Sequence, residues 1–151
     1  HCISSAASDV YKRQIILAME IENQSVDYRP LILVAEDDDS NFKLIKAIIG
    51  KKCEVQWARN GEEIVSLFLE NRDKADAILM DIKMPVMNGL DATQRIRREG
   101  GTLPIIMQTA YAFSSDRENA MNAGASEVLV KPITLSTLRN CLSSYLPQLV
   151  W

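Results

Sequence analysis

The chain has 151 residues, which suits one domain with a single hydrophobic core. Its formal net charge is −3 and its basic residues form no stripe, which argues against a nucleic-acid-binding surface. The three cysteines, Cys2, Cys53 and Cys141, are odd in number and far apart, so we expect no disulfide framework, no zinc site and a reducing, cytoplasmic location. No apolar run approaches the length of a membrane span.

The first residues are not expected to belong to the folded protein. Ser4–Gln14, SSAASDVYKRQ, resembles the frame translation of an adapter used to prepare sequencing libraries, so residues 1–14 are interpreted as a non-native leader. An ordinary disordered polar leader is the alternative, and it leads to the same exclusion. We expect the true N-terminus to be missing. Residues 15–30 are predicted to form a linker that ends at Pro30, and a short helix within it is one possibility.

From residue 31 onward, five short and mostly apolar runs have the length of strands. Four of them are almost wholly apolar, as parallel strands covered by helices on both faces should be. In the second run, polar and apolar residues alternate, which predicts a position at the edge of the sheet. The runs are Leu31–Ala35, Cys53–Ala58, Ala77–Met80, Leu103–Thr109 and Val128–Val130.

Between the runs, apolar residues recur at the spacing of amphipathic helices. Strict alternation of strand and helix predicts an α/β fold, with a right-handed, doubly wound, five-stranded parallel sheet and helices on both faces. The stripes expected in the core are Leu44, Ile45, Ile48 and Ile49 between Ser40 and Gly50, then Ile64, Leu67 and Phe68 after Asn60–Gly61, and finally Leu135, Leu138, Leu142 and Tyr145/Leu146 after Thr134.

Four of the runs finish at charged or hydroxyl residues. Glu36 and Asp37 follow the first run, Asp81 follows the third, Thr109 closes the fourth and Lys131 follows the fifth. Because parallel strands place their carboxyl ends at the same edge of a sheet, we expect these five side chains to share one crevice.

Several carboxylates in one crevice need a cation. Two carboxylates about 4 Å apart repel by roughly 4 kcal/mol at an effective dielectric constant of 20, so Glu36, Asp37 and Asp81 would not all stay ionised alone. Oxygen ligands without imidazole or thiolate favour Mg²⁺. The cation would leave Asp81 ionised as a nucleophile, with Lys131 and the Thr109 hydroxyl able to meet a phosphoryl oxygen.

Other phosphate, metal and catalytic motifs fail on residue identity or spacing. An EF-hand loop begun at Asp37 would need Gly where Phe42 stands and Glu where Ile48 stands. Neither GxxxxGK[ST] nor GxGxxG occurs, which excludes a P-loop and a dinucleotide fingerprint. The single histidine, His1, lies in the leader, so this chain is expected to hold neither a Ser/His/Asp triad nor a phosphohistidine.

Four segments stand out in chain order: LILVAEDDDSN (31–41), ILMDIKMPVMNGLDATQRIR (78–97), LPIIMQTAYA (103–112) and NAGASEVLVKPI (122–133). Together they resemble the receiver domain of two-component signalling. The resemblance covers residues 31–146 and leaves 147–151 as a C-terminal tail. It implies a flavodoxin-like fold with strand order 2-1-3-4-5, in agreement with the edge position of the second run.

The resemblance implies a phosphoacceptor function. Asp81 would take a phosphoryl group from a phosphohistidine on a histidine kinase or phosphotransfer domain, in cis or in trans. Thr109 would be the hydroxyl that turns towards the phosphoryl group, and Lys131 would be its ion-pair partner, followed by a cis peptide bond to Pro132. A downstream protein would read the change on the surface formed by residues 113–146.

The resemblance also implies a Mg²⁺ site. Asp37 would bind the ion directly, Glu36 would act through a coordinated water, and the Lys83 main-chain carbonyl would complete the protein ligands beside Asp81. Pro85 and Gly89 match the family's turn after the phosphorylation site.

One position departs from the receiver pattern. Val128 stands three residues before Lys131, where the family usually has an aromatic residue whose ring moves inward when the hydroxyl turns. The usual coupling between hydroxyl and ring is therefore in doubt. Tyr111 and Phe113 are candidates to report the switch instead, and ordinary loop aromatics are the alternative interpretation.

Two other functions stay open. A Mg²⁺-dependent Asp-nucleophile phosphatase would also use Asp81, but such hydrolases usually carry an acid two residues later, where this chain has Lys83. An unphosphorylated receiver-like interaction module would keep the fold without the chemistry. By itself a receiver is not a classical enzyme, since it assists only its own phosphorylation and slow dephosphorylation.

The expected context is a larger protein. The EDDDSN opening and the linker ending at Pro30 favour the carboxyl-terminal receiver of a hybrid sensor histidine kinase over a stand-alone regulator. Such a domain would be cytoplasmic and tethered to a membrane kinase through the missing N-terminal part. The stimulus, the donor histidine and the output partner are not predicted.

Overall fold

Five parallel strands form the sheet expected from the sequence. The computed structural model describes residues 5–23, 28–111 and 113–151. The strand order is β2-β1-β3-β4-β5, which confirms the predicted flavodoxin-like topology with its second strand at the edge. The strands are β1 (Leu31–Ala35), β2 (Glu54–Ala58), β3 (Ala75–Asp81), β4 (Ile105–Thr109) and β5 (Glu127–Val130).

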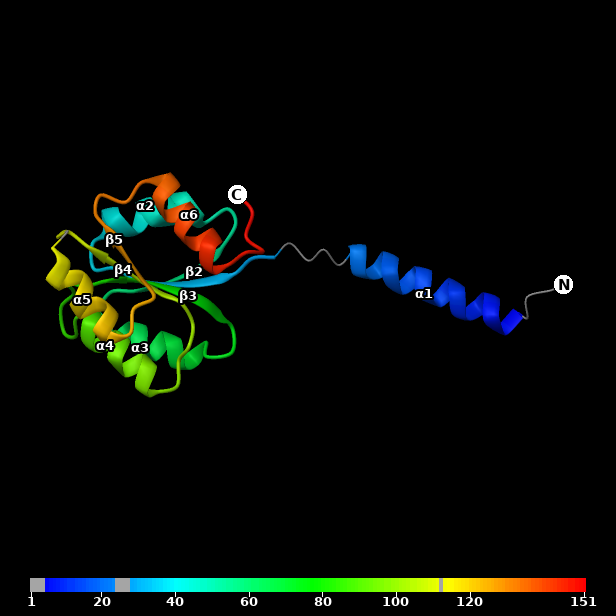
Figure 1. The fold of residues 1–151 in the computed structure, drawn as a ribbon, viewed down its shortest axis with the longest axis horizontal. Helices are drawn as coiled ribbons and strands as arrows, with labels where there is room; N and C mark the ends of the chain where they lie inside the picture. Colours follow the sequence, from blue (N-terminus) through cyan, green and yellow to red (C-terminus); the bar gives the residue numbers. More distant parts are fainter. Residues whose placement is uncertain (1–4, 24–27, 112) are drawn as a thin grey trace.

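Helices cover both faces of this sheet. Figure 1 shows α2 (Asp39–Ile49) and α6 (Leu135–Tyr145) on one face, and α3 (Gly61–Glu70), α4 (Gly89–Arg98) and α5 (Ser114–Ala123) on the other. Alternate residues of each strand pack against the helices on opposite faces of the sheet. In β1, for example, Leu33 packs with the α3–α5 layer, whereas Ile32 and Val34 pack with α2 and α6. Both faces of the central strands are therefore buried, which explains their continuous apolar sequence.

Polar side chains cap four of these helices. Asp38, Asn60, Asn88 and Thr134 precede α2, α3, α4 and α6, and each accepts a hydrogen bond from the main-chain N–H three residues later. The Asp38 and Asn88 caps fix the starting points of the two helices that follow β1 and β3. These caps thereby fix the loops that follow β1 and β3, which lie at the same edge of the sheet as Asp81.

Two leucines predicted to lie in the core are exposed. Leu44 is 49% exposed and Leu135 is 51% exposed, so both assignments are wrong. In α2, the buried stripe is Phe42, Ile45, Ile48 and Ile49, and Leu44 falls beside that stripe rather than within it. Leu135 is the first residue of α6, and the residues of this helix that reach the core come one and two turns later, at Leu138 and Leu142.

A further helix, α1 (Ser5–Asn23), precedes the sheet. It runs without interruption across the predicted boundary between the leader and the linker at residues 14 and 15. Its described large apolar side chains, such as Tyr11 and Ile16, are exposed. None of the helices in the described parts of the chain combines the length and apolarity needed to cross a membrane.

The C-terminal residues pack back onto the domain. Leu149 is buried in the layer formed by α2 and α6. The Trp151 indole N–H donates to the main-chain oxygen of Arg139 and to the Ser143 hydroxyl. The Arg139 guanidinium lies over the Trp151 ring and donates to the Ile48 main-chain oxygen. Residues 149 and 151 therefore contribute to the α2–α6 layer instead of extending freely from it.

Candidate functional site

The carboxyl edge of the sheet gathers the residues singled out in the sequence. Asp81 is the last residue of β3, and it lies opposite Gln108 in β4. Thr109 closes β4, and its neighbour in β5 is Val130, the residue before Lys131. Glu36 follows directly after β1 and donates its main-chain N–H to the Ala58 oxygen. The parallel register therefore brings these strand ends to one place.

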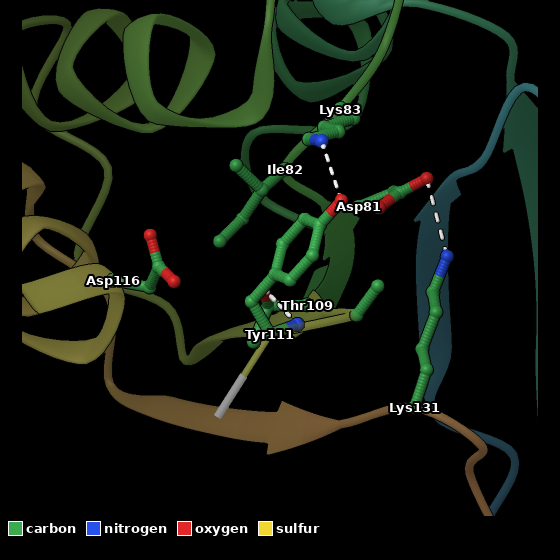
Figure 2. Close-up of a pocket in the computed structure, with 8 residues that line it drawn as sticks. Asp81, Ile82, Lys83, Thr109, Tyr111, Asp116 and Lys131 are labelled. Atoms are coloured by element: carbon green, nitrogen blue, oxygen red, sulfur yellow. Dashed lines mark hydrogen bonds and ion pairs between the residues drawn. The ribbon is translucent and has the colours of Figure 1, made fainter. Parts of the chain in front are cut away.

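Lys131 forms ion pairs with two carboxylates at this edge. Its Nζ atom is 3.3 Å from Asp81 Oδ2 and 3.4 Å from Glu36 Oε2. Glu36 is 1% exposed and Asp81 is 5% exposed, so their charges are removed from bulk water. The Lys131–Pro132 peptide bond is cis, as the family resemblance implied. One ammonium group thus bridges two buried acids that stand at the carboxyl ends of different strands (Figure 2 shows the pair with Asp81).

The carboxylates at this edge outnumber the nearby ammonium group. One carboxylate oxygen each from Glu36, Asp37 and Asp81 lie within 4.8 Å of one another. Burial, together with the Asp81 charge, raises the pKa of Glu36 to about 7, although Lys131 acts in the opposite direction. Burial also raises the pKa of Asp81, again against the effect of Lys131. A further positive charge would therefore stabilise the ionised cluster.

This donor set fits a hard divalent cation. All three side chains offer carboxylate oxygens, which are the ligands that Mg²⁺ prefers. Glu36 and Asp81 are buried whereas Asp37 is exposed, so the cluster is open towards solvent on the Asp37 side. That opening suits an ion that keeps several of its waters.

A pocket of about 160 Å³ lies beside Asp81. The Thr109 hydroxyl in its wall accepts a hydrogen bond from the Tyr111 main-chain N–H, at 3.1 Å. The hydroxyl oxygen is therefore a partner of its own loop in this conformation. The lining residues, most of them labelled in Figure 2, are Asp81, Ile82, Lys83, Thr109, Ala110, Tyr111, Asp116 and Lys131.

The Tyr111 ring lines this pocket, and its hydroxyl points towards the Lys83 ammonium (Figure 2). The Lys83 Nζ atom is 3.3 Å from the Tyr111 hydroxyl and 4.5 Å from the ring centroid. Tyr111 also stacks on Phe113, and both rings are exposed. The sequence offered Tyr111 as a candidate reporter of the switch or as an ordinary loop aromatic, and it offered Lys83 for its main-chain carbonyl. It did not predict the contact between their side chains. Asp116 was missed as well, because no local pattern marks it as a pocket residue.

Gly89 allows the loop after β3 to close against Asp81. Its main-chain N–H donates to the Ile82 oxygen, and a Cβ atom at this position would collide with the Asp81 main-chain oxygen. The need for glycine here is one of close approach. The loop that carries Lys83 is thereby held next to the end of β3.

Val128 is buried in β5 opposite Met107 of β4. A valine there packs in the α3–α5 layer of the core and has no aromatic ring.

Comparison with known proteins places the chain in a family. The model of the response regulator receiver domain matches residues 32–143. Hybrid signal transduction histidine kinase I of Dictyostelium discoideum is 37% identical over 121 residues, which are 75% of this chain and 7% of that protein. Sensor histidine kinase RcsC of Escherichia coli K12 is 33% identical over 118 residues, which are 76% of this chain and 12% of that protein. The chain thus spans a small part of these curated relatives.

Solved structures give the same result. The receiver domain of sensor histidine kinase PA1611 from Pseudomonas aeruginosa, described with a magnesium ion in its active site cleft, has a TM-score of 0.72 and 33% identity, covering 80% of this chain and 99% of that one. The receiver domain of Ssk1 from Saccharomyces cerevisiae, solved with the histidine phosphotransfer protein Ypd1, has a TM-score of 0.73 and 25% identity, covering 81% and 92%. With a matching family model over most of its length and the expected strand order, this chain belongs to the receiver-domain family of response regulators.

Proposed function

We propose that this receiver domain accepts a phosphoryl group from a phosphohistidine onto Asp81 in a Mg²⁺-dependent phosphorelay. The observation that carries the proposal is the placement of the Asp81 carboxylate at the head of an open pocket, 3.3 Å from the Lys131 ammonium and within reach of two further carboxylates. In this proposal Asp81 is the nucleophile, Lys131 is the cation for the phosphoryl oxygens, and Glu36 and Asp37 are the acids that would hold the metal.

The transfer step follows from these groups. An oxygen of the Asp81 carboxylate attacks phosphorus while the bond from phosphorus to the donor imidazole nitrogen breaks, and the imidazole keeps the electron pair and takes up a proton. Lys131 neutralises charge on the transferred oxygens. Most of the catalysis is positioning and electrostatic stabilisation.

Magnesium would be held by the chain's own acids. In this proposal Asp37 binds the ion directly, Glu36 acts through a coordinated water, and Asp81 and the Lys83 main-chain carbonyl complete the protein ligands. The three carboxylate oxygens within 4.8 Å of one another support this assignment, as does the magnesium described in the PA1611 receiver domain. When bound, the ion supplies positive charge that lets the acids stay ionised and balances the phosphoryl oxygens.

The donor and the larger context are part of the proposal. The Ssk1 receiver domain was solved with a histidine phosphotransfer protein, and the kinase relatives are hybrid or sensor histidine kinases. We infer that this domain is the receiver of a hybrid sensor histidine kinase. A phosphohistidine on the same or another chain would supply its phosphoryl group. The cytoplasmic location expected from the cysteines remains a prediction.

Uptake of phosphate from a small donor tests the function directly. Purified protein with acetyl phosphate and Mg²⁺ is expected to gain one phosphate per chain, and chelation of the metal by EDTA should suppress the gain. Intact-mass spectrometry at neutral pH, before the acyl phosphate hydrolyses, provides the measurement. A protein that gains no phosphate with Mg²⁺ would favour the interaction-module alternative, and sustained turnover of a generic phosphate ester would favour the phosphatase. Neither alternative has an observation of its own in its favour.

The output step should appear as a change in the Thr109 loop. A phosphoryl group carries about −1.5 to −2 charge and offers acceptors for the Thr109 hydroxyl, which would then leave the Tyr111 N–H. We expect altered amide hydrogen exchange over residues 113–146 after phosphorylation, measured by mass spectrometry. The Asp81→Asn protein treated identically is the control. Equal protection in the two samples over this segment would contradict the proposed switch.

A further inference from the structure

The Trp57 side chain is clamped beside the acidic crevice. Its ring is stacked on Phe42 of α2, with 4.0 Å between the centroids and 2° between the planes. The Arg59 guanidinium carbon lies over the same ring, 4.0 Å from its centroid. Two groups at that distance cannot share one face, so the indole is held between them. Arg59 is in turn paired with Asp39 at 2.8 Å, which ties the clamp to the first turn of α2.

The Trp57 indole donates a hydrogen bond to a residue of the acidic crevice. The Trp57 Nε1–H donates to the main-chain oxygen of Glu36 at 2.8 Å. On its other side, the Glu36 main-chain N–H donates to the Ala58 oxygen at 3.0 Å. Both main-chain polar groups of Glu36 are thus bound to β2, one through the backbone and one through an indole. The Glu36 carboxylate is oriented separately, by the Asp38 main-chain N–H at 3.2 Å and by the Lys131 ammonium at 3.4 Å.

This contact lies where the chain leaves β1 to form the acidic turn. Glu36 is almost fully buried, so a carbonyl left without a donor there would carry a desolvation cost. The peptide group that contains the Glu36 oxygen also contains the Asp37 nitrogen. Its orientation therefore sets the direction in which Asp37 leaves the strand. A rigid donor on this oxygen fixes the relative placement of the two acids.

We propose that Trp57 is a positioning residue for the Glu36–Asp37 pair and, through it, sets the affinity of the crevice for a divalent cation. The inference rests on the Mg²⁺ site of the proposed function. The stack on Phe42 and the Arg59 cation limit the ring's motion, so the N–H group is held ready and little ordering is needed when the ion binds. The competing interpretation is that Trp57 only covers the edge of the core between α2 and β2.

The Trp57→Phe variant separates these interpretations because it keeps an aromatic ring for the stack and removes the N–H donor. Outer hydrogen-bond partners of metal ligands typically change metal affinity by about 10- to 100-fold, so we expect the Mg²⁺ dissociation constant to rise about tenfold. Isothermal titration calorimetry with MgCl₂ is the measurement. Trp151→Phe is the matched control, since that indole bonds to Arg139 and Ser143 in the C-terminal part of the fold and should leave Mg²⁺ affinity unchanged.

A second readout keeps the test valid if Trp57→Phe folds poorly. The chain has two tryptophans, so Trp151→Phe leaves a single indole N–H. Its ¹H–¹⁵N cross-peak should shift on addition of Mg²⁺, with the same dissociation constant as calorimetry gives. Unchanged affinity in a folded Trp57→Phe protein, or an indole signal that ignores bound Mg²⁺, would overturn the positioning role while leaving the metal site intact. Absence of Mg²⁺ binding in the unmodified protein would overturn both.

Discussion

The Asp81→Asn protein is expected to take up no phosphate from acetyl phosphate and Mg²⁺, a loss of at least about a hundredfold against the unmodified domain. The amide has nearly the same shape as the carboxylate but lacks its nucleophilic oxygen. The variant should still fold, because Lys131 keeps Glu36 as an ion-pair partner and one of two mutually repelling buried acids is neutralised. Phosphate per chain, followed by intact-mass spectrometry over time, is the quantity to compare.

Asp73→Asn is the matched control for this experiment. Asp73 is an exposed acid in the turn before β3, at the opposite end of the strand that finishes at Asp81. Its replacement should leave phosphate uptake unchanged within a factor of about two. One phosphate per chain on the Asp81→Asn protein would assign the acceptor to another residue, and a peptide map would identify it.

The metal-free domain is expected to lose stability as the pH rises from 5.5 to 7. In the folded protein the pKa of Glu36 is about 7, whereas its ordinary value is 4.5. Between these values the folded state binds more protons than the unfolded state, so the slope of unfolding free energy against pH is negative. A raised acid pKa therefore stabilises the fold at low pH, and this stabilisation is lost as the pH approaches 7. Over this window the expected loss is about 2 kcal/mol.

Urea unfolding in EDTA at several pH values measures this slope. The Glu36→Gln protein has no proton to lose at this position, so most of the slope should disappear. With Mg²⁺ in excess, the unfolding free energy should instead increase with pH. The ion binds the deprotonated acids, so the affinity of the folded domain for Mg²⁺ rises until Glu36 is ionised. A stability that increases with pH in EDTA would show that Glu36 is ionised throughout and that the crevice tolerates its charges without a metal.

The fold and the identity of the crevice residues were predictable because both depend on local patterns. Apolar runs of strand length alternating with amphipathic stretches specify a doubly wound sheet, and the mixed run around Trp57 marked the edge strand that the structure confirms. Parallel strands share a carboxyl edge, so the residues that close the runs could be placed in one crevice before any coordinates. The predictions for Leu44 and Leu135 were wrong because a few apolar residues at helical spacing do not show where the buried face of the helix ends.

The sequence by itself determined the five strands, the alternation of helices with them from residue 31 onward, and which strand ends meet, but it did not predict helix α1. Only the tertiary structure decided how the side chains pair there: Lys131 bridging Glu36 and Asp81, the burial that raises the pKa of Glu36, Thr109 held by the Tyr111 N–H, and the Trp57 indole on the Glu36 oxygen. The physical reason is that periodicity encodes the direction of a side chain relative to its own strand or helix. A contact of about 3 Å between residues far apart in the chain depends on sheet register, twist and rotamer, which no local pattern contains.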